Sequence, residues 1–124
     1  MERIYPIFVP DESINEDEVE HTDVIQWCYN NLSHQNVLVL GLDDLSLIQF
    51  KSKVLDIINS ENDSMLQIGE DDWIISQNVK ENIKKELTHY IKTICSNREK
   101  AIIESILILL DISIKTNKNL YFIF

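Results

Sequence analysis

The sequence predicts a small α+β or α/β domain in which a mixed β-sheet packs against about four helices. Two observations lead to this class. Short runs of β-branched and aromatic residues alternate along the chain with longer segments whose apolar residues recur at helical spacing. The chain has 124 residues, 44% of them hydrophobic, with only 2 Gly and 2 Pro, which is typical of one globular domain over residues 1–124. The expected order of elements is β-α-β-α-β-β-α-α-β.

The first strand and the first helix are predicted before residue 35. Residues 4–9 are rich in β-branched and aromatic side chains, and two nearby prolines favour the edge of a sheet. Ser13 and Glu16 have the spacing of a capping box, in which each side chain satisfies a free backbone amide at a helix start. A helix over about 14–33 is therefore expected, with an apolar stripe on one face and carboxylates on the other.

The next segment, residues 37–40, reads VLVL and precedes a glycine. A short, continuously apolar run of this kind is typical of a strand that is buried on both faces of a parallel or mixed sheet. A second helix should begin at Asp43 or Asp44 and continue to the polar segment 60–64, because its apolar residues keep helical spacing up to that point.

The second half of the chain predicts a hairpin, two helices and a final strand. Residues 65–68 and 73–76 are β-prone and flank four turn-forming residues. The clearest amphipathic stripe follows over 79–94. The helix over 101–114 is apolar around almost its whole circumference, so it is expected at the centre of the fold. The apolar segment 120–124 should form a strand that the sheet or a partner covers.

The charge of the chain is strongly negative and unevenly distributed. The net charge is −10, and no Lys or Arg occurs between Arg3 and Lys51. That interval contains nine carboxylates: Asp11, Glu12, Glu16, Asp17, Glu18, Glu20, Asp23, Asp43 and Asp44. Such a surface repels phosphate backbones and anionic lipids, so direct binding to nucleic acid or membrane is disfavoured. The same field attracts a basic protein, although acidic surfaces also serve solubility alone.

Cysteine use and hydropathy point to a cytoplasmic protein. Cys28 and Cys95 lie on apolar helix faces and are expected to be free, buried thiols rather than a disulfide. The chain opens without the pattern of a secretory signal. Its longest apolar run, 101–114, is interrupted by two acids and is too short to cross a bilayer.

Catalytic and metal motifs are weak. His21, His34 and His89 have no partner at the spacing of a known metal motif. Asp43 and Asp44 follow a predicted strand, where open α/β sheets bind ligands and Mg²⁺. However, the chain has no glycine-rich phosphate loop and no nucleophile motif, and an Asp at this position commonly caps a helix. No cofactor and no metal are expected.

These observations favour a non-catalytic, acidic binding protein. The leading hypothesis is a bacterial immunity or antitoxin-type inhibitor whose acidic surface covers the basic active site of a toxin, such as a nuclease. The predicted contact residues are Glu16, Glu20, Asp23, Asp43 and Asp44, with Trp27 as an aromatic anchor unless it is buried. One alternative is a small Mg²⁺-dependent or phosphate-handling enzyme that uses Asp43 and Asp44. Another is an intracellular adaptor that pairs with a second chain through 4–9 or 120–124 as an edge strand.

Overall fold

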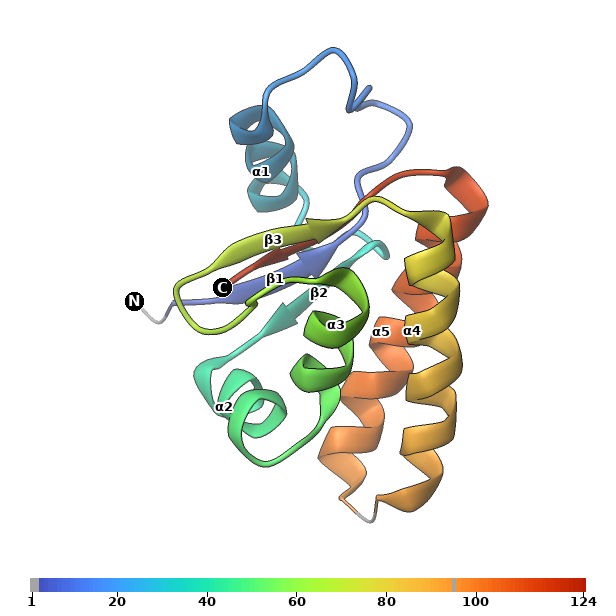
Figure 1. Cartoon of the computed structure of the whole chain (residues 1–124). Helices are drawn as coiled ribbons and strands as arrows, with labels where there is room; N and C mark the ends of the chain where they lie inside the picture. The colour runs from blue at the N-terminus through green and yellow to red at the C-terminus, as the bar shows by residue number, and fades with distance from the viewer. Residues whose placement is uncertain (1–2, 95) are drawn as a thin grey trace.

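The structure is a computed structural model that describes residues 3–94 and 96–124 (Figure 1). The fold class is α+β, as predicted from the sequence, with an antiparallel sheet and helices on both of its faces. The elements follow in this order: β1 (Tyr5–Phe8), α1 (His21–Asn30), β2 (Val37–Leu40), α2 (Leu42–Phe50), α3 (Val54–Asn62), β3 (Asp71–Ile74), α4 (Gln77–Tyr90), the short 3-10 helix η1 (Ile91–Thr93), α5 (Asn97–Thr116) and β4 (Leu120–Ile123).

The strand order is β2-β1-β4-β3, and every neighbouring pair is antiparallel. The sheet is therefore not mixed, and residues 4–9 and 120–124 form its centre rather than its edges. Both segments are fully buried, which suits strands that are hydrogen-bonded on two sides. Pro6 is tolerated in the central strand β1 because the ladder with β4 joins only Ile7 and Phe8. The adaptor alternative thus loses both of the edge strands on which it depended.

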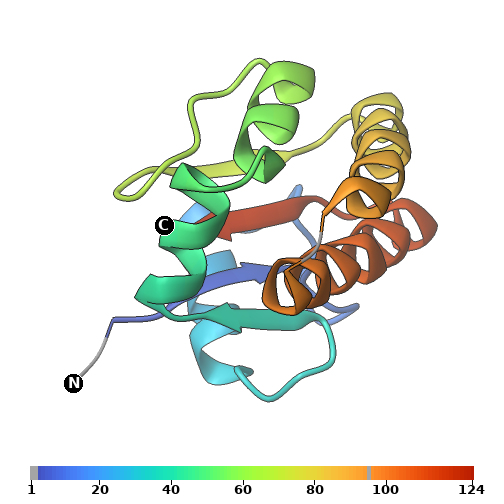
Figure 2. The same cartoon turned by 90° about the horizontal axis from the view of Figure 1, so that it is seen from below.

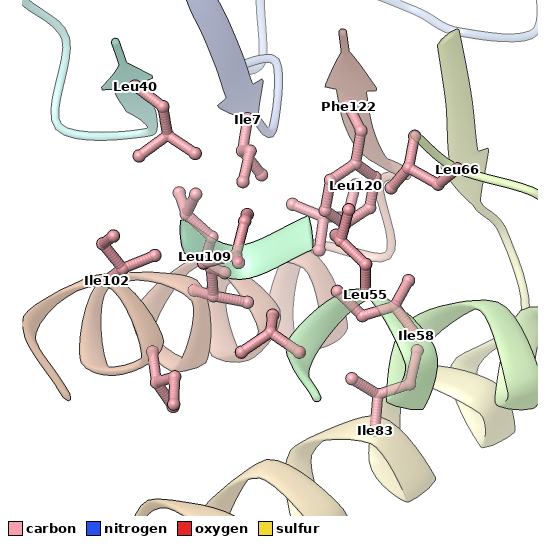
Figure 3. Close-up of a cluster of buried hydrophobic side chains, with 14 of the residues drawn as sticks. Ile7, Leu40, Leu55, Ile58, Leu66, Ile83, Ile102, Leu109, Leu120 and Phe122 are labelled. Atoms are coloured by element: carbon pink, nitrogen blue, oxygen red, sulfur yellow. The ribbon is translucent and has the colours of Figure 1, made fainter. Parts of the chain in front are cut away.

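Alternation along the strands divides the core into two layers. Ile7, Leu40 and Phe122 point toward α2–α5 and pack against helix residues such as Leu109 and Ile83 (Figure 3). The opposite face of the sheet is covered by α1 and holds a smaller core (Figure 2). The buried members of that core are Phe8, Val24, Trp27, Cys28, Tyr121 and Ile123.

The first helix begins later than its sequence pattern predicts, at His21 rather than near residue 14. The side chain of Ser13 bonds to Asp11, and Asn15 accepts a hydrogen bond from the Asp17 amide, so both residues stabilise turns instead of a helix start. The chain becomes helical only at the next pair with capping-box spacing. There the Glu20 amide donates to the Asp23 carboxylate at 3.1 Å.

The predicted second helix is divided into α2 and α3. At the break, the Ser52 hydroxyl accepts a bond from the Val54 amide, and the Tyr90 hydroxyl accepts one from the Lys53 amide at 3.2 Å. These side chains satisfy amides that a continuous helix would have bonded internally. The expected pattern of one long helix is therefore interrupted by side chains that compete for its backbone.

The predicted hairpin is also absent, because β3 pairs with β4 and not with residues 65–68. The Asn59 side chain accepts a bond from the Leu66 amide at 2.7 Å and donates one to its carbonyl at 3.0 Å. The Asn59 side chain thus satisfies the backbone groups of Leu66 that a neighbouring strand would otherwise bond. The chain then turns at Gly69, whose φ of 93° lies in the region that favours glycine.

The two long helices agree better with the sequence. Ser96 caps α5 by accepting a bond from the Glu99 amide, as the spacing predicts. The cap of α4 is Ser76, one turn before the expected stripe. However, α5 lies against the sheet rather than at the centre of the fold, and Ile108 on its outer side is 59% exposed. Within the described residues, no helix has the length and hydropathy that a bilayer span needs.

Cys28 is buried and free, as predicted. Burial raises the pKa of its thiol to about 12, so the thiol is protonated over the whole physiological range. Cys95 lies outside the described residues.

Candidate acidic interface

The most concentrated charge of the molecule lies in the loop after β1 and at the start of α1. Figure 1 shows this loop and α1 together on one side of the sheet, with α2–α5 on the other. Five of its carboxylates are exposed and make no ion pair with any cation that the structure describes. They are Glu12, Asp17, Glu18, Glu20 and Asp23. We call these five residues the acidic face.

The acidic face is held against the sheet by Glu16. Its carboxylate accepts hydrogen bonds from the Tyr121 hydroxyl at 2.6 Å and from the Asn119 amide at 3.1 Å. The Lys118 ammonium donates to the Ile14 carbonyl in the same loop. Burial and the Glu16 carboxylate together raise the pKa of Tyr121 above its usual value, so Tyr121 remains a donor. Glu16, predicted as a contact residue, is therefore half-buried and used inside the fold.

The other end of the loop is fixed by Asp11. The hydrogen bond from the Ser13 hydroxyl lowers the pKa of Asp11, and His34 lies 3.6 Å away on its other side. The His34 ring packs edge-on against Trp27, with ring centroids 5.3 Å apart. With both ends anchored, the exposed carboxylates between them occupy a defined position.

Trp27 belongs to the core beneath the acidic face. Its side chain is 7% exposed and packs on Phe8, with centroids 6.0 Å apart. The interpretation of Trp27 as a surface anchor is therefore corrected, because α1 turns this residue toward the sheet. The exposed aromatic residue on α1 is Tyr29, which is 44% exposed.

Asp43 and Asp44 lie apart from the acidic face, on α2 and across the sheet from α1 (Figure 1). Asp44 accepts two hydrogen bonds from the Arg98 guanidinium, at 2.6 and 2.7 Å, and a third from the Gly41 amide. The Arg98 bond holds the pKa of Asp44 below its usual value. Asp44 is thus neutralised and caps α2, while Asp43 is exposed at the same helix start. The predicted single patch is therefore divided by the sheet.

Asp71 is a carboxylate on the α1 side of the sheet that no local pattern predicts. The register of β3 with β4 sets Asp71 on the same face of the sheet as Trp73 and Ile123, which is the α1 face. Burial raises the pKa of Tyr29, and interactions with Cys28 and Asp71 add to that rise. Only the pairing of residues far apart in sequence reveals that Asp71 lies on this face of the sheet.

The basic residues after residue 50 lie mostly on the opposite side of the molecule. Lys118 contacts the acidic loop, and Lys80 is buried, where it donates to the Gln77 side chain and the Lys118 carbonyl. Lys84 forms an ion pair with Asp111 at 2.7 Å. The remaining cations are on α4, η1, α5 or the loop before α3: Lys51, Lys53, Lys85, Lys92, Arg98, Lys100 and Lys115. None of these cations forms an ion pair with the acidic face.

Among the described residues, no group of three or more His, Cys, Asp or Glu side chains is arranged to hold a metal ion. Of the two residues that the enzyme alternative uses, Asp44 already bonds to Arg98, whereas Asp43 is exposed.

A solved structure, the Neisseria DNA mimic protein DMP12, is similar to this chain over 98% of the chain and 100% of that protein. The TM-score is 0.78 and the sequence identity is 18%, so the likeness is one of fold. No family model and no curated protein matched the chain.

Proposed function

We propose that this chain is a non-catalytic binding protein that presents its acidic face to the DNA-binding surface of a basic protein and occupies that surface in place of DNA. The observation that carries the proposal is the acidic face itself, with five exposed carboxylates and no paired cation among the described residues. The fold that it shares with a protein described as a DNA mimic supports the same conclusion.

Binding would follow from the chemistry of DNA recognition. Proteins that bind DNA neutralise phosphates with Lys and Arg, and these contacts supply much of the affinity. Carboxylates at fixed positions satisfy the same cations and also accelerate the encounter through long-range attraction. The anchors at Glu16 and Asp11 keep the loop ordered before binding, so that little conformational entropy is lost on association.

The finer hypothesis concerns the identity of the partner. A bacterial toxin with nuclease activity has a basic substrate cleft, and a protein that fills the cleft inhibits it without any catalysis. An immunity or antitoxin-type role is therefore one form of the proposed function. It places the protein in the cytoplasm, where such a toxin would act. The contact residues proposed for this role are those of the acidic face together with Tyr29 and Asp71.

The experiment compares two variants that lose equal charge. In the first, Glu12→Gln, Asp17→Asn, Glu18→Gln and Glu20→Gln remove four exposed carboxylates from the acidic face. In the control, Asp56→Asn, Asp63→Asn, Glu81→Gln and Glu86→Gln remove four exposed carboxylates from α3, α4 and the turn after α3. Partners are captured from native cells and identified, and each is then tested for displacement of labelled duplex DNA by the purified chain.

We expect the wild type and the control to displace DNA from the captured partner, and the first variant to bind it more weakly, on the order of tenfold or more. The affinity should fall as salt rises. Equal binding by both variants, or binding that leaves DNA in place, contradicts the proposal.

A further inference from the structure

The two edges of the sheet differ in how they are protected. The outer strands are β2 and β3, and Figure 2 shows β2 as the outermost strand on its side. Exposed edges usually carry charges, prolines or bulges that prevent pairing with another chain. The β3 edge carries Asp71 and Asp72, whereas β2 consists of two Val and two Leu residues only. Thus β2 lacks the usual protection.

The backbone groups that β2 leaves free can be identified from its pairing. The Val9 amide donates to the Asn36 carbonyl, so these two residues form a hydrogen-bonded pair. Such pairs alternate along an antiparallel ladder, and Leu38 and Leu40 are therefore the residues of β2 whose backbone groups bond to β1. Val37 and Val39 direct their backbone groups outward. The Val37 amide bonds to the His34 carbonyl. The amide and carbonyl of Val39 and the carbonyl of Val37 have no backbone partner among the described residues.

The hollow beside this edge is lined by uncharged side chains. Between β2 and α5 lies a shallow hollow of about 130 Å³, and none of its lining residues is ionisable: Gln35, Val37, Leu38, Ser105, Ile108 and Leu109. Ile108 on α5 is 59% exposed, and Val39, whose side chain is on the α1 face of the same edge, is 38% exposed. In a chain of net charge −10, an uncharged surface is where a second copy meets the least repulsion.

We propose that β2 pairs with β2 of a second copy of this chain, antiparallel and about a two-fold axis perpendicular to the sheet. Identical strands pair antiparallel across such an axis, so Val39 donates and accepts at the junction and the two sheets become continuous. The axis keeps both α5 helices on the same side of the joined sheet. Ile108 then packs against the same residue of the second copy, over the junction.

Charge complementarity supports a second copy as the occupant. With Ile108 at the axis, the two α5 helices run antiparallel. Lys115 is seven residues after Ile108, so it lies opposite Ala101 of the second copy, which is seven residues before Ile108. Glu104 of the second copy is then one helical turn away from Lys115. Lys115 makes no ion pair within the described chain, so the Glu104 of the second copy is available to it. The acidic faces are on the opposite side of the joined sheet.

The proposed contact between the two copies is small. A four-residue strand and two turns of helix bury less than the roughly 800 Å² per partner of a standard stable interface. We therefore expect a weak, concentration-dependent dimer. Two chains of like net charge repel each other, so salt should strengthen this association, whereas it should weaken binding of a basic partner. The salt response thus separates the dimer from the proposed function.

The test measures the molar mass of the purified chain by light scattering and sedimentation over a wide range of concentration, at low and at high salt. Val39→Pro removes the outward amide but leaves the ladder with β1 intact. Ile108→Lys places a charge at the axis, on an exposed helix position. Met65→Lys is the matched control, because Met65 is exposed and apolar but lies away from β2.

We expect the wild type and Met65→Lys to dimerise with the same affinity, and Ile108→Lys and Val39→Pro to dimerise at least about tenfold more weakly, since each loses a buried contact or a backbone bond. If Val39→Pro does not fold by circular dichroism, Ile108→Lys decides alone. A wild type that stays monomeric at every concentration, or a dimer that Ile108→Lys leaves unchanged, overturns the proposal.

Discussion

The Tyr121 hydroxyl donates to the Glu16 carboxylate at 2.6 Å, and this bond joins the acidic loop to the central strand β4. Removing the hydroxyl with Tyr121→Phe leaves the carboxylate with only its bond from the Asn119 amide. A hydrogen bond to a charged group contributes about 1.5–3 kcal/mol, so the free energy of unfolding in urea should fall by that amount.

Tyr29→Phe is the control for this change, because the Tyr29 hydroxyl makes no hydrogen bond within the described residues and the ring is half exposed. Amide hydrogen exchange over residues 11–20 should also accelerate in Tyr121→Phe and not in Tyr29→Phe. The same urea midpoint for both variants would count against the anchoring role of Glu16.

The Arg98–Asp44 pair predicts a pH-dependent contribution to stability. The Arg98 bond holds the pKa of Asp44 below its usual value of 3.8. A carboxyl with a lower pKa in the folded state stabilises the fold above the unfolded pKa, and this contribution is lost as the pH falls through the folded pKa. Asp44→Asn should therefore lower the free energy of unfolding by up to about 1 kcal/mol at neutral pH, since Arg98 is exposed.

The difference between Asp44→Asn and the wild type should shrink as the pH falls below 3.8. Thermal unfolding as a function of pH measures it, with Asp43→Asn as the control at an exposed neighbouring position. A difference that stays constant in acid would mean that the effect comes from capping geometry rather than from charge.

Cys28 should be chemically silent in the native protein. Its thiol is buried and its pKa is raised to about 12, so at neutral pH the sulfur is neither accessible to a reagent nor ionised. In a Cys95→Ser background, a thiol-specific chromogenic reagent should react with Cys28 only at the rate of unfolding. Fast modification without denaturant would show that α1 leaves the sheet readily.

Asn59 should be more important for stability than its half-buried position suggests. Its side chain accepts bonds from the Leu66 amide and the Ser64 hydroxyl and donates to the Leu66 carbonyl. Asn59→Ala leaves these backbone groups unpaired and should destabilise the fold by about 1–3 kcal/mol in urea unfolding. Asn30→Ala, at an exposed position on α1, should change the stability little; a similar loss in both variants contradicts the prediction.

The class of the fold followed from the sequence, but the start of α1 did not. Two nearby segments carry capping spacing, Ser13 with Glu16 and Glu20 with Asp23. Judged by residue type alone, the first pair is the stronger signal for a helix start. The structure uses the second pair, because the Glu16 carboxylate bonds to Tyr121, more than a hundred residues later. Competition between a local cap and a distant partner is not visible in a local pattern.

The candidate site was predicted only in part, again because contacts between distant residues are not visible in a local pattern. The absence of cations between Arg3 and Lys51 predicted exposed carboxylates, and Glu20 and Asp23 are exposed. It gave no sign that Arg98 reaches Asp44 from the start of α5, or that the register of β3 sets Asp71 near α1. Charge counted along the chain identifies which residues are acidic, while strand order decides which of them share a surface.

The central position of β4 has a consequence for biosynthesis. A ribosome that has delivered the chain only as far as α5 has released β1 without one of its two neighbours, and β3 without its only one. The apolar faces of α1–α5 then have no complete sheet to pack against, so native structure should appear only after β4 has left the exit tunnel. Until then, charge repulsion or chaperones must prevent aggregation of the nascent chain.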